Sequence, residues 1–187
     1  MRYGPEKYFW RVARGRGFAV ALGLAAAVFL GANAGAQEIY QTPGEFLAEA
    51  LGQTIPPAQL LEISGEMRPD VARILGHRYS PDRLRYWHAG ERTAWILEEI
   101  GKYRPITTGI VISGGEIEDV RVLIYRESHG WEVHHDFFTD QFKGLTLDSR
   151  HRLSGRIDGI SGATLSVNAL RALARLALYF DQAVHAD

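Results

Sequence analysis

The chain has 187 residues, of which 46% are hydrophobic, 21 are Lys or Arg, 22 are Asp or Glu and none is Cys. This length is enough for one domain with its own core, and without thiolates the chain can form no disulfide, Cys-ligated iron–sulfur cluster, zinc ribbon or haem attachment. The net charge of −1 argues against a nucleic-acid partner, because such proteins carry a basic excess.

The first 36 residues have the order of a secretory signal. Residues 1–16 hold five basic side chains and one acid, residues 17–36 are uncharged, and Ala34-Gly35-Ala36 supplies an A-x-A cleavage pattern. The densest apolar run, Phe18 to Leu30, is short for a spanning helix, which needs about 20 residues. We therefore expect residues 1–36 to be a signal peptide or an N-terminal membrane anchor.

Export fixes the expected location of the rest of the chain. The protein is predicted to be periplasmic, either soluble after cleavage or anchored to the inner membrane by residues 17–36. Residues 37–187 keep 16 of the basic and 21 of the acidic side chains, so the exported part carries a net charge of −5 with neutral His. The near-neutral total thus combines a basic leader with an acidic domain.

Residues 37–80 are predicted to form a helical lead-in. Thr42-Pro43-Gly44-Glu45 is a capping box with proline at the first helical position, which predicts a helix through Ala50 that ends near Gly52. After Pro56-Pro57, a second helix is expected over Ala58 to Ile63. A third is expected to begin at Arg68-Pro69-Asp70 and to run to about Gly76.

From residue 83 onward the period changes from helical to alternating. Alternate apolar residues on either side of Ala89-Gly90-Glu91 indicate one hairpin, and the run from Ile106 through Ser113-Gly114-Gly115 to Tyr125 indicates a second. We expect an antiparallel sheet of about four strands. The last strand has a thin polar face, which indicates that helices cover part of the sheet.

The C-terminal third is predicted to be helical again, which gives an α+β domain over residues 81–187. Asp136 to Phe142 is expected to be a helix that stops at Gly144, and a polar loop over residues 146–156 leads to the final helix. In that helix, which follows Ser161-Gly162-Ala163-Thr164, helical spacing places one set of residues inward: Val167, Leu170, Ala174, Ala177 and Leu178. Three others are expected to face away: Arg171, Arg175 and Asp181.

The segment Ser161-Gly162-Ala163-Thr164 places small residues where a helix begins. Unpaired backbone N–H groups and the positive end of the helix dipole converge there, which suits an anion such as phosphate. On physical grounds alone, ordinary helix capping by these side chains is the favoured interpretation. The segment is not a nucleotide P-loop, because the pattern G-x-x-x-x-G-K-[ST] and its lysine are absent.

Three segments resemble the FMN-binding domain family, which includes the flavin-carrying subunits of the sodium-pumping NADH:quinone reductase and of the Rnf complex. Residues 158–164, D-G-I-S-G-A-T, match its motif D-x-x-S-G-A-T. Residues 127–131, E-S-H-G-W, are similar to a degraded E-T-P-G-L-G turn, and residues 138–144 are similar to F-x-x-Q-F-K-G. With the second hairpin, the resemblance covers about residues 90–182.

The resemblance implies a covalent FMN. In that family the last threonine of S-G-A-T is joined to the FMN phosphate by a separate flavin transferase that uses FAD, and here this residue is Thr164. The sequence offers no obvious base beside Thr164, which a threonine nucleophile requires. The remaining residues of the implied cofactor-binding set are Asp158, Glu127, Ser128, Ser161, Gly162 and Ala163.

The departures from the family turn leave the surroundings of the flavin ring open. Trp131 or Tyr125 could stack on it, or Trp131 could simply anchor a loop, and Lys143 could offset flavin charge or be solvated. His134 and His135 are not expected to share a metal, because adjacent residues on a strand point to opposite faces. We expect no metal site.

These features predict an exported, covalently flavinylated protein that carries electrons between a membrane partner and a periplasmic one. It would be an electron-transfer protein or oxidoreductase subunit rather than a stand-alone enzyme, since no catalytic constellation is visible. The alternative is a binding or structural module of the same fold that holds no flavin and uses Thr164 as a helix cap.

Overall fold

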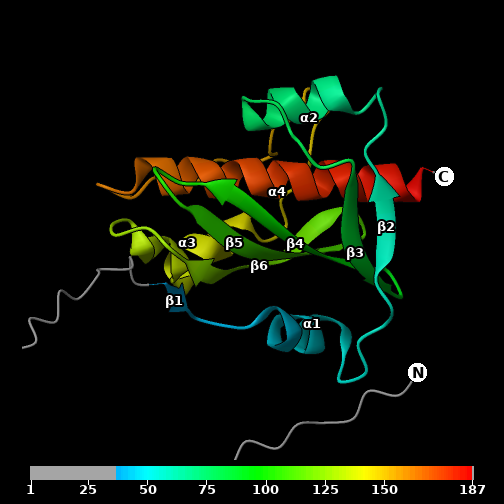
Figure 1. Ribbon diagram of the computed structural model, residues 1–187, viewed down its shortest axis with the longest axis horizontal. Coiled ribbons are helices and arrows are strands. Elements are labelled where there is room, and N and C mark those ends of the chain that lie inside the picture. Colours follow the sequence, from blue (N-terminus) through cyan, green and yellow to red (C-terminus); the bar gives the residue numbers. More distant parts are fainter. Residues whose placement is uncertain (1–36, 187) are drawn as a thin grey trace, which may run out of the picture. The chain divides into compact units, whose positions relative to one another are not determined.

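The computed structural model describes residues 37–186 (Figure 1). The predicted signal peptide or anchor, residues 1–36, lies outside the described residues. The strands are β1 (Glu38–Ile39), β2 (Gln59–Glu62), β3 (Arg83–Ala89), β4 (Arg92–Ile100), β5 (Pro105–Ser113) and β6 (Glu116–Tyr125). The helices are α1 (Pro43–Leu51), α2 (Arg68–Leu75), α3 (Asp136–Thr139) and α4 (Thr164–His185), with 3₁₀ turns η1 (Trp131–His134) and η2 (Asp140–Phe142).

The strands form one antiparallel sheet in the order β1-β6-β5-β4-β3-β2. The α+β class and both predicted hairpins are confirmed, but the sheet has six strands instead of about four. The two additional strands lie at the edges, and both come from residues 37–80, which were expected to be a helical lead-in. With two and four residues, they are too short to show an alternating pattern in the sequence.

The helix predicted over Ala58 to Ile63 is wrong. Gln59–Glu62 is β2, which pairs with Arg83–Tyr86 of β3. The preceding Pro56-Pro57 favours extended backbone, and β3 offers unpaired N–H and C=O groups along its free edge. Tertiary pairing therefore outweighs the weak helical pattern of a four-residue segment.

The other two helices of residues 37–80 are confirmed. Thr42 and Glu45 form the predicted capping box at the start of α1, and Gly76 ends α2 in the left-handed conformation. Helix α1 packs on one face of the sheet, where a Cβ added to Gly109 would lie 2.7 Å from the ring of Phe46. The glycine in β5 thus makes room for the helix.

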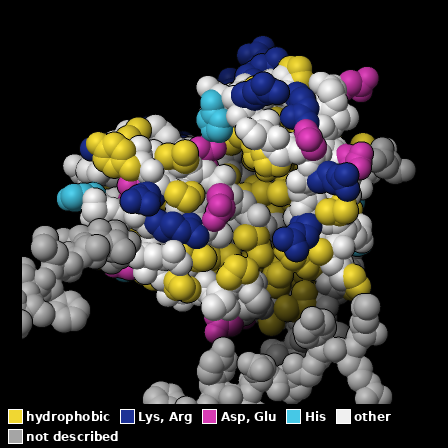
Figure 2. All heavy atoms as spheres, viewed as in Figure 1, with side chains coloured by type: hydrophobic (Ala, Val, Ile, Leu, Met, Phe, Trp, Pro, Cys, Tyr) yellow, Lys and Arg dark blue, Asp and Glu magenta, His cyan; other side chains and the backbone are white. Residues whose placement is uncertain are grey.

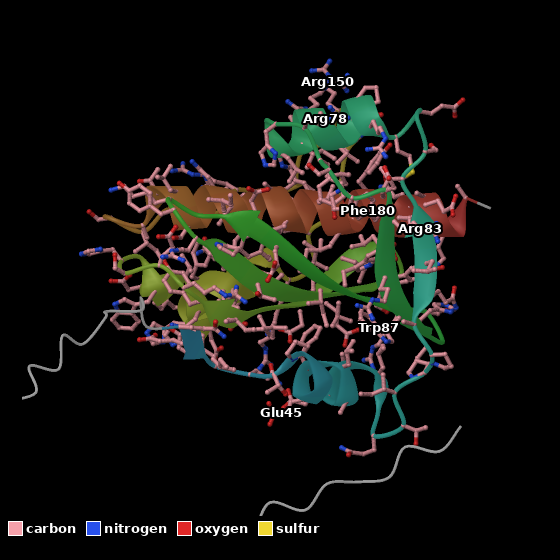
Figure 3. All side chains as sticks on the ribbon, in the orientation of Figure 1. Glu45, Arg78, Arg83, Trp87, Arg150 and Phe180 are labelled. Atoms are coloured by element: carbon pink, nitrogen blue, oxygen red, sulfur yellow. The ribbon has the colours of Figure 1, made fainter. Side chains whose placement is uncertain are left out.

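Helix α4 covers the opposite face of the sheet and carries most of the core (Figure 1). Phe180 packs against Trp95 of β4 with ring centroids 5.7 Å apart, and α2 packs on α4; Figure 3 marks the place of Phe180. The predicted apolar stripe of α4 is buried. None of the helices among residues 37–186 is both long and apolar enough to span a membrane.

One residue of α4 departs from the prediction. Asp181, expected to face away, is only 3% exposed and accepts a hydrogen bond of 2.5 Å from the hydroxyl of Thr93. It lies three residues after the buried Leu178, so helical geometry places it on the same inner face. The charge of the side chain, rather than its position in the helical period, led to the wrong expectation.

The segment between β6 and α4 contains short helical turns that pack beside the sheet. The helix predicted over Asp136 to Phe142 is present as α3 followed by η2. Gly144 ends it with a φ of +73° and donates its N–H to Ile117 of β6 at 2.8 Å. This contact holds residues 138–144 beside the sheet, next to the loop that precedes α4.

Candidate functional site

A cleft of about 520 Å³ opens at the N-terminal end of α4. Its walls come from the β4–β5 turn, the segment that follows β6 and the first turn of α4. The lining residues are Lys102, Tyr103, Glu127, Ser128, His129, Gly162, Ala163, Thr164, Leu165 and Ser166. Its volume falls within the range of small-molecule and cofactor sites.

Glu127 holds the β4–β5 turn against the segment that follows β6. Its Oε1 accepts hydrogen bonds from the backbone N–H groups of Lys102, Tyr103 (2.5 Å) and Arg104 (2.9 Å). Burial alone would raise the pKa of this carboxyl, but the three N–H donors outweigh it and lower the pKa below its ordinary value. Glu127 is therefore an ionised structural clamp on one wall of the cleft.

The segment after Glu127 is tied to α4 by a small buried network. The hydroxyl of Tyr125 donates to the carbonyl of His129 at 2.5 Å and lies 2.9 Å from the hydroxyl of Ser166. Gly130 packs against this network. Its φ is +85°, and a Cβ added to it would lie 3.0 Å from the hydroxyl oxygens of both Tyr125 and Ser166. Only glycine fits this contact without displacement, because it combines left-handed backbone with close packing.

The loop before α4 is positioned by two side chains from outside it. Arg171 donates to the carbonyl of Ile157, and the N–H of Asp158 donates to Oε1 of Gln141 at 2.7 Å. Gln141 belongs to the F-x-x-Q-F-K-G segment, so two of the three segments noted in the sequence are in direct contact. Gly162, with a φ of +83°, then turns the chain into the helix.

The first turn of α4 has no side-chain cap. Ala163 is the N-cap residue, and the first hydrogen bond of the helix joins Val167 N–H to Ala163 C=O at 2.9 Å. Within residues 37–186, the backbone N–H groups of Thr164, Leu165 and Ser166 find no protein acceptor. Thr164 is therefore the first helical residue and not a cap, which contradicts that part of the alternative interpretation.

The chemistry of the cleft favours a phosphate. Three backbone donors and the positive end of a 22-residue helix face the same region. Lys102 contributes the one Lys or Arg side chain among the residues that line the cleft, and its Nζ lies 4.9 Å from the ring centroid of Tyr103. The carboxylate of Glu127 on the facing wall opposes an anion, but its three N–H donors partly offset its charge.

A second hollow, of about 400 Å³, adjoins this cleft. The two share Tyr103, Glu127 and Ser128, and Trp131 lines the second hollow. Tyr103 is 70% exposed and Trp131 is 45% exposed, so both present aromatic surface at the rim. Such rings can pack against a planar ligand that extends out of the cleft.

Most of the predicted site residues lie together. Thr164, Gly162 and Ala163 line the cleft at the helix start, and Glu127 and Ser128 line the facing wall. The two exceptions lie in the loop before α4 and do not line the cleft: Ser161, and Asp158, whose carboxylate is 3.4 Å from the guanidinium of Arg156.

Four lining residues were not predicted from the sequence: Lys102, Tyr103, Leu165 and Ser166. A fifth, His129, belongs to the E-S-H-G-W segment but was given no role. Lys102 and Tyr103 lie in the turn between β4 and β5, which connects the two predicted hairpins. Pairing of the two strands along their whole length, from Arg92↔Ser113 to Ile100↔Pro105, brings this turn to the cleft. An explicit β4–β5 hairpin would have pointed to it.

Three side chains were candidates for contact with the flavin: Tyr125, Trp131 and Lys143. They differ in where they lie relative to the cleft. Tyr125 is 1% exposed and engaged through its hydroxyl, so its ring face is not accessible. Trp131 lies at the second hollow. The ammonium of Lys143 is 2.6 Å from the carboxylate of Asp140 and does not line the cleft.

The sequence argument about His134 and His135 rested on a wrong local structure. These residues lie at the end of η1 and just after it, not in a strand, and their ring centroids are 3.9 Å apart. His134 stacks on Tyr40 at 4.0 Å. Among residues 37–186, no group of three His, Cys, Asp or Glu side chains is arranged to hold a metal ion.

Fold and cleft together define an α+β ligand-binding domain whose anion site is made by backbone N–H groups at a helix start. The family model described as an FMN-binding domain matches residues 101–179. The match confirms the resemblance to the FMN-binding domain family, and it supports FMN as the ligand. None of the curated proteins matches the chain significantly.

The residues of the cleft fit FMN. The unpaired N–H groups of Thr164, Leu165 and Ser166 suit its phosphate, and the exposed ring of Tyr103 at the rim suits its planar isoalloxazine. When bound, FMN supplies one- and two-electron redox chemistry that no side chain of this cysteine-free chain offers. We call this the flavin cleft below.

Proposed function

We propose that this protein is an exported flavoprotein in which FMN is joined to Thr164 by a phosphoester bond, and that it carries electrons between a membrane partner and a periplasmic one. The observation that carries the proposal is the state of Thr164. It is the exposed first residue of α4, it lines the flavin cleft, and its side chain caps nothing.

The attachment reaction requires an external enzyme. The Oγ1 of Thr164 forms a bond to the phosphorus of the FMN half of FAD, the P–O bond to the AMP half breaks, and AMP leaves with the electron pair. The hydroxyl proton passes to a base of the flavin transferase. Among the residues that line the cleft, two side chains could act as bases: His129, whose Nδ1 lies 3.0 Å from the hydroxyl of Ser128, and Glu127, whose three N–H donors make its carboxylate a weaker base. Within residues 37–186 neither is hydrogen-bonded to Thr164.

The same geometry supports electron transfer. A phosphate held at the helix start anchors one end of the cofactor, and the cleft is open at the protein surface near the exposed rings of Tyr103 and Trp131. A tethered cofactor at an open rim can approach partner proteins without being lost by dilution in the periplasm. The protein then provides tethering, orientation and electrostatic tuning.

Co-expression with a flavin transferase tests the covalent bond. The exported protein, denatured in SDS, is expected to give a fluorescent band, and Thr164→Val is expected to reduce that fluorescence to background. Thr164→Ser keeps the hydroxyl and is expected to retain labelling, so it controls for damage to the helix start. Peptide mass spectrometry is expected to place the FMN mass on residue 164, and the intact mass tests cleavage after Ala36.

Two results would contradict the proposal. The first is a dark band from the folded, co-expressed wild-type protein. The second is equal fluorescence from wild type and Thr164→Val. Folded protein that binds free FMN but is not covalently labelled would be consistent with an FMN-binding domain and would exclude the phosphoester bond.

A further inference from the structure

A second cleft, of about 550 Å³, lies farther along α4 and has a different construction. Its walls are α2, the loop over residues 152–157 and the middle of α4. Four of its lining residues are arginines: Arg152, Arg156, Arg171 and Arg175. The apolar part of its wall comes from Ile74, Leu75, Leu153, Ile157 and Ala172. We call it the arginine cleft.

Two of these arginines lack a carboxylate partner. Arg152 is paired with Asp148 at 2.8 Å, and Arg156 is 3.4 Å from Asp158. Arg171 and Arg175 lie one turn apart on α4, and within residues 37–186 neither is within 4 Å of an acidic oxygen. Four guanidiniums and two carboxylates leave a local charge of +2 in a chain whose residues 37–187 carry −5.

Arg175 also has unused hydrogen-bonding capacity. One of its terminal nitrogens donates to the carbonyl of Ile74, but its Nε–H is shielded from solvent and has no acceptor. Arg171 likewise uses one nitrogen for the carbonyl of Ile157. Each guanidinium has five N–H donors, so both retain donors after these contacts.

The surroundings of the cleft are basic as well. Figure 2 shows several Lys or Arg side chains together over α2, and Arg78 and Arg150 lie at this end of the molecule in Figure 3. The nearby Asp70 is 2.7 Å from Arg73 and 3.9 Å from His151. The acidic groups of this region therefore already face basic partners.

From this arrangement we propose that the arginine cleft binds a phosphate ester. A phosphate monoester carries a charge of about −2, which matches the local excess, and guanidinium forks bind its oxygens better than ammonium groups do. The apolar wall suits the organic part of the ester. A soluble phosphate ester and a phospholipid headgroup share this chemistry, and the experiment separates them.

Calorimetric titration with glycerol 3-phosphate at constant ionic strength tests the site. The protein is made without flavin transferase. Wild type is expected to show saturable binding that Thr164→Glu, which places a negative charge at the start of α4 in the flavin cleft, leaves unchanged. Arg171→Gln combined with Arg175→Gln is expected to weaken binding at least tenfold. Glutamine removes the positive charge and keeps a polar side chain at each position. The matched control is Arg83→Gln combined with Arg85→Gln, which removes two charges from β3 outside this cleft. This control is expected to leave the affinity for glycerol 3-phosphate unchanged.

A parallel vesicle assay identifies the source of the phosphate. Flotation with vesicles of phosphatidylcholine and phosphatidic acid, whose headgroup is a phosphate monoester, but not with phosphatidylcholine alone, would support a headgroup ligand. Glycerol 3-phosphate binding without flotation would support a soluble ester. If the double variant does not fold, Arg152→Gln and Arg156→Gln, which alter exposed loop residues, are each expected to weaken binding about threefold.

Three results would overturn the proposal: no saturable binding, equal affinity in all arginine variants, or complete displacement by an equal concentration of chloride. Loss of binding in Thr164→Glu alone would also overturn it, because the ester would then occupy the flavin cleft. Failure of covalent flavin attachment has no bearing on this test, since the protein used carries no attached flavin.

Discussion

The two clefts along α4 present their hydrogen-bond donors in opposite ways. The flavin cleft presents main-chain N–H groups at the first turn of the helix, among small residues. The arginine cleft presents side-chain guanidiniums from the loop over residues 152–157 and from the middle of the same helix. The first depends on backbone conformation, and the second depends on which side chains are present.

This difference determines what each cleft tolerates. A main-chain site survives most side-chain changes but fails when the backbone moves, because its donors are fixed in the helix. A guanidinium site tolerates small backbone shifts, since long side chains adjust, but it fails when charge is removed. Changes to the glycines, to Arg171 and to the carboxylate of Glu127 should therefore affect the two clefts unequally.

The largest effect is expected from Gly130→Ala. The added Cβ would lie 3.0 Å from two hydroxyl oxygens in a backbone with a φ of +85°. Strain and crowding together are expected to destabilise the protein by about 2–4 kcal/mol, measured by urea unfolding. Displacement of the His129–Gly130 segment should also reduce flavin labelling, whereas the affinity of the arginine cleft for glycerol 3-phosphate should not change.

Gly90→Ala is the matched control for that change. Gly90 also has a positive φ, +64°, but an added Cβ meets no atom within 4 Å. It should cost about 1 kcal/mol, from backbone strain alone. Equal losses in the two variants would mean that the contact with Tyr125 and Ser166 does not constrain Gly130.

A smaller effect is expected where a residue of the arginine cleft also contacts the loop that leads to the flavin cleft. Arg171 lines the arginine cleft and also donates to Ile157, directly before the D-G-I-S-G-A-T loop, whereas Arg175 contacts Ile74 of α2. Arg171→Gln is therefore expected to slow flavin labelling severalfold, and Arg175→Gln to leave the rate near that of wild type. Labelling is measured as fluorescence per folded protein over time; equal rates for both variants would show that Arg171 does not position the loop.

The contrast between a main-chain site and a side-chain site also explains why the flavin cleft could be predicted from the sequence and the arginine cleft could not. Ser161 to Thr164 are consecutive, so the main-chain site at the helix start is visible as a motif and its helix as a period. The arginine cleft draws on residues 74–75, 152–157 and 168–175, which only the tertiary fold brings together. The edge strand β2 and the buried Asp181 were missed for a related reason: pairing with β3 and packing against Thr93 outweigh local preference.

The smallest effect is expected from Glu127→Gln, and it depends on pH. The three backbone donors keep the folded-state pKa of Glu127 below its ordinary value of 4.5, although burial opposes them. The ionised clamp therefore stabilises the fold fully above about pH 4.5, and this contribution is lost as the pH falls through the lowered folded-state value. A neutral amide oxygen accepts the same hydrogen bonds more weakly, so the variant should lose about 1 kcal/mol at pH 7.

Urea unfolding of wild type and Glu127→Gln across pH 3–7 measures this difference, with Glu116→Gln, an exposed change at the start of β6, as the control. The gap between wild type and Glu127→Gln should narrow below pH 4.5, and Glu116→Gln should follow wild type throughout. A gap that stays constant with pH would mean that packing of the side chain, and not its charge, holds the turn. Arginine does not titrate in this range, so the difference between wild type and Glu127→Gln reports the wall of the flavin cleft and not the guanidiniums of the arginine cleft.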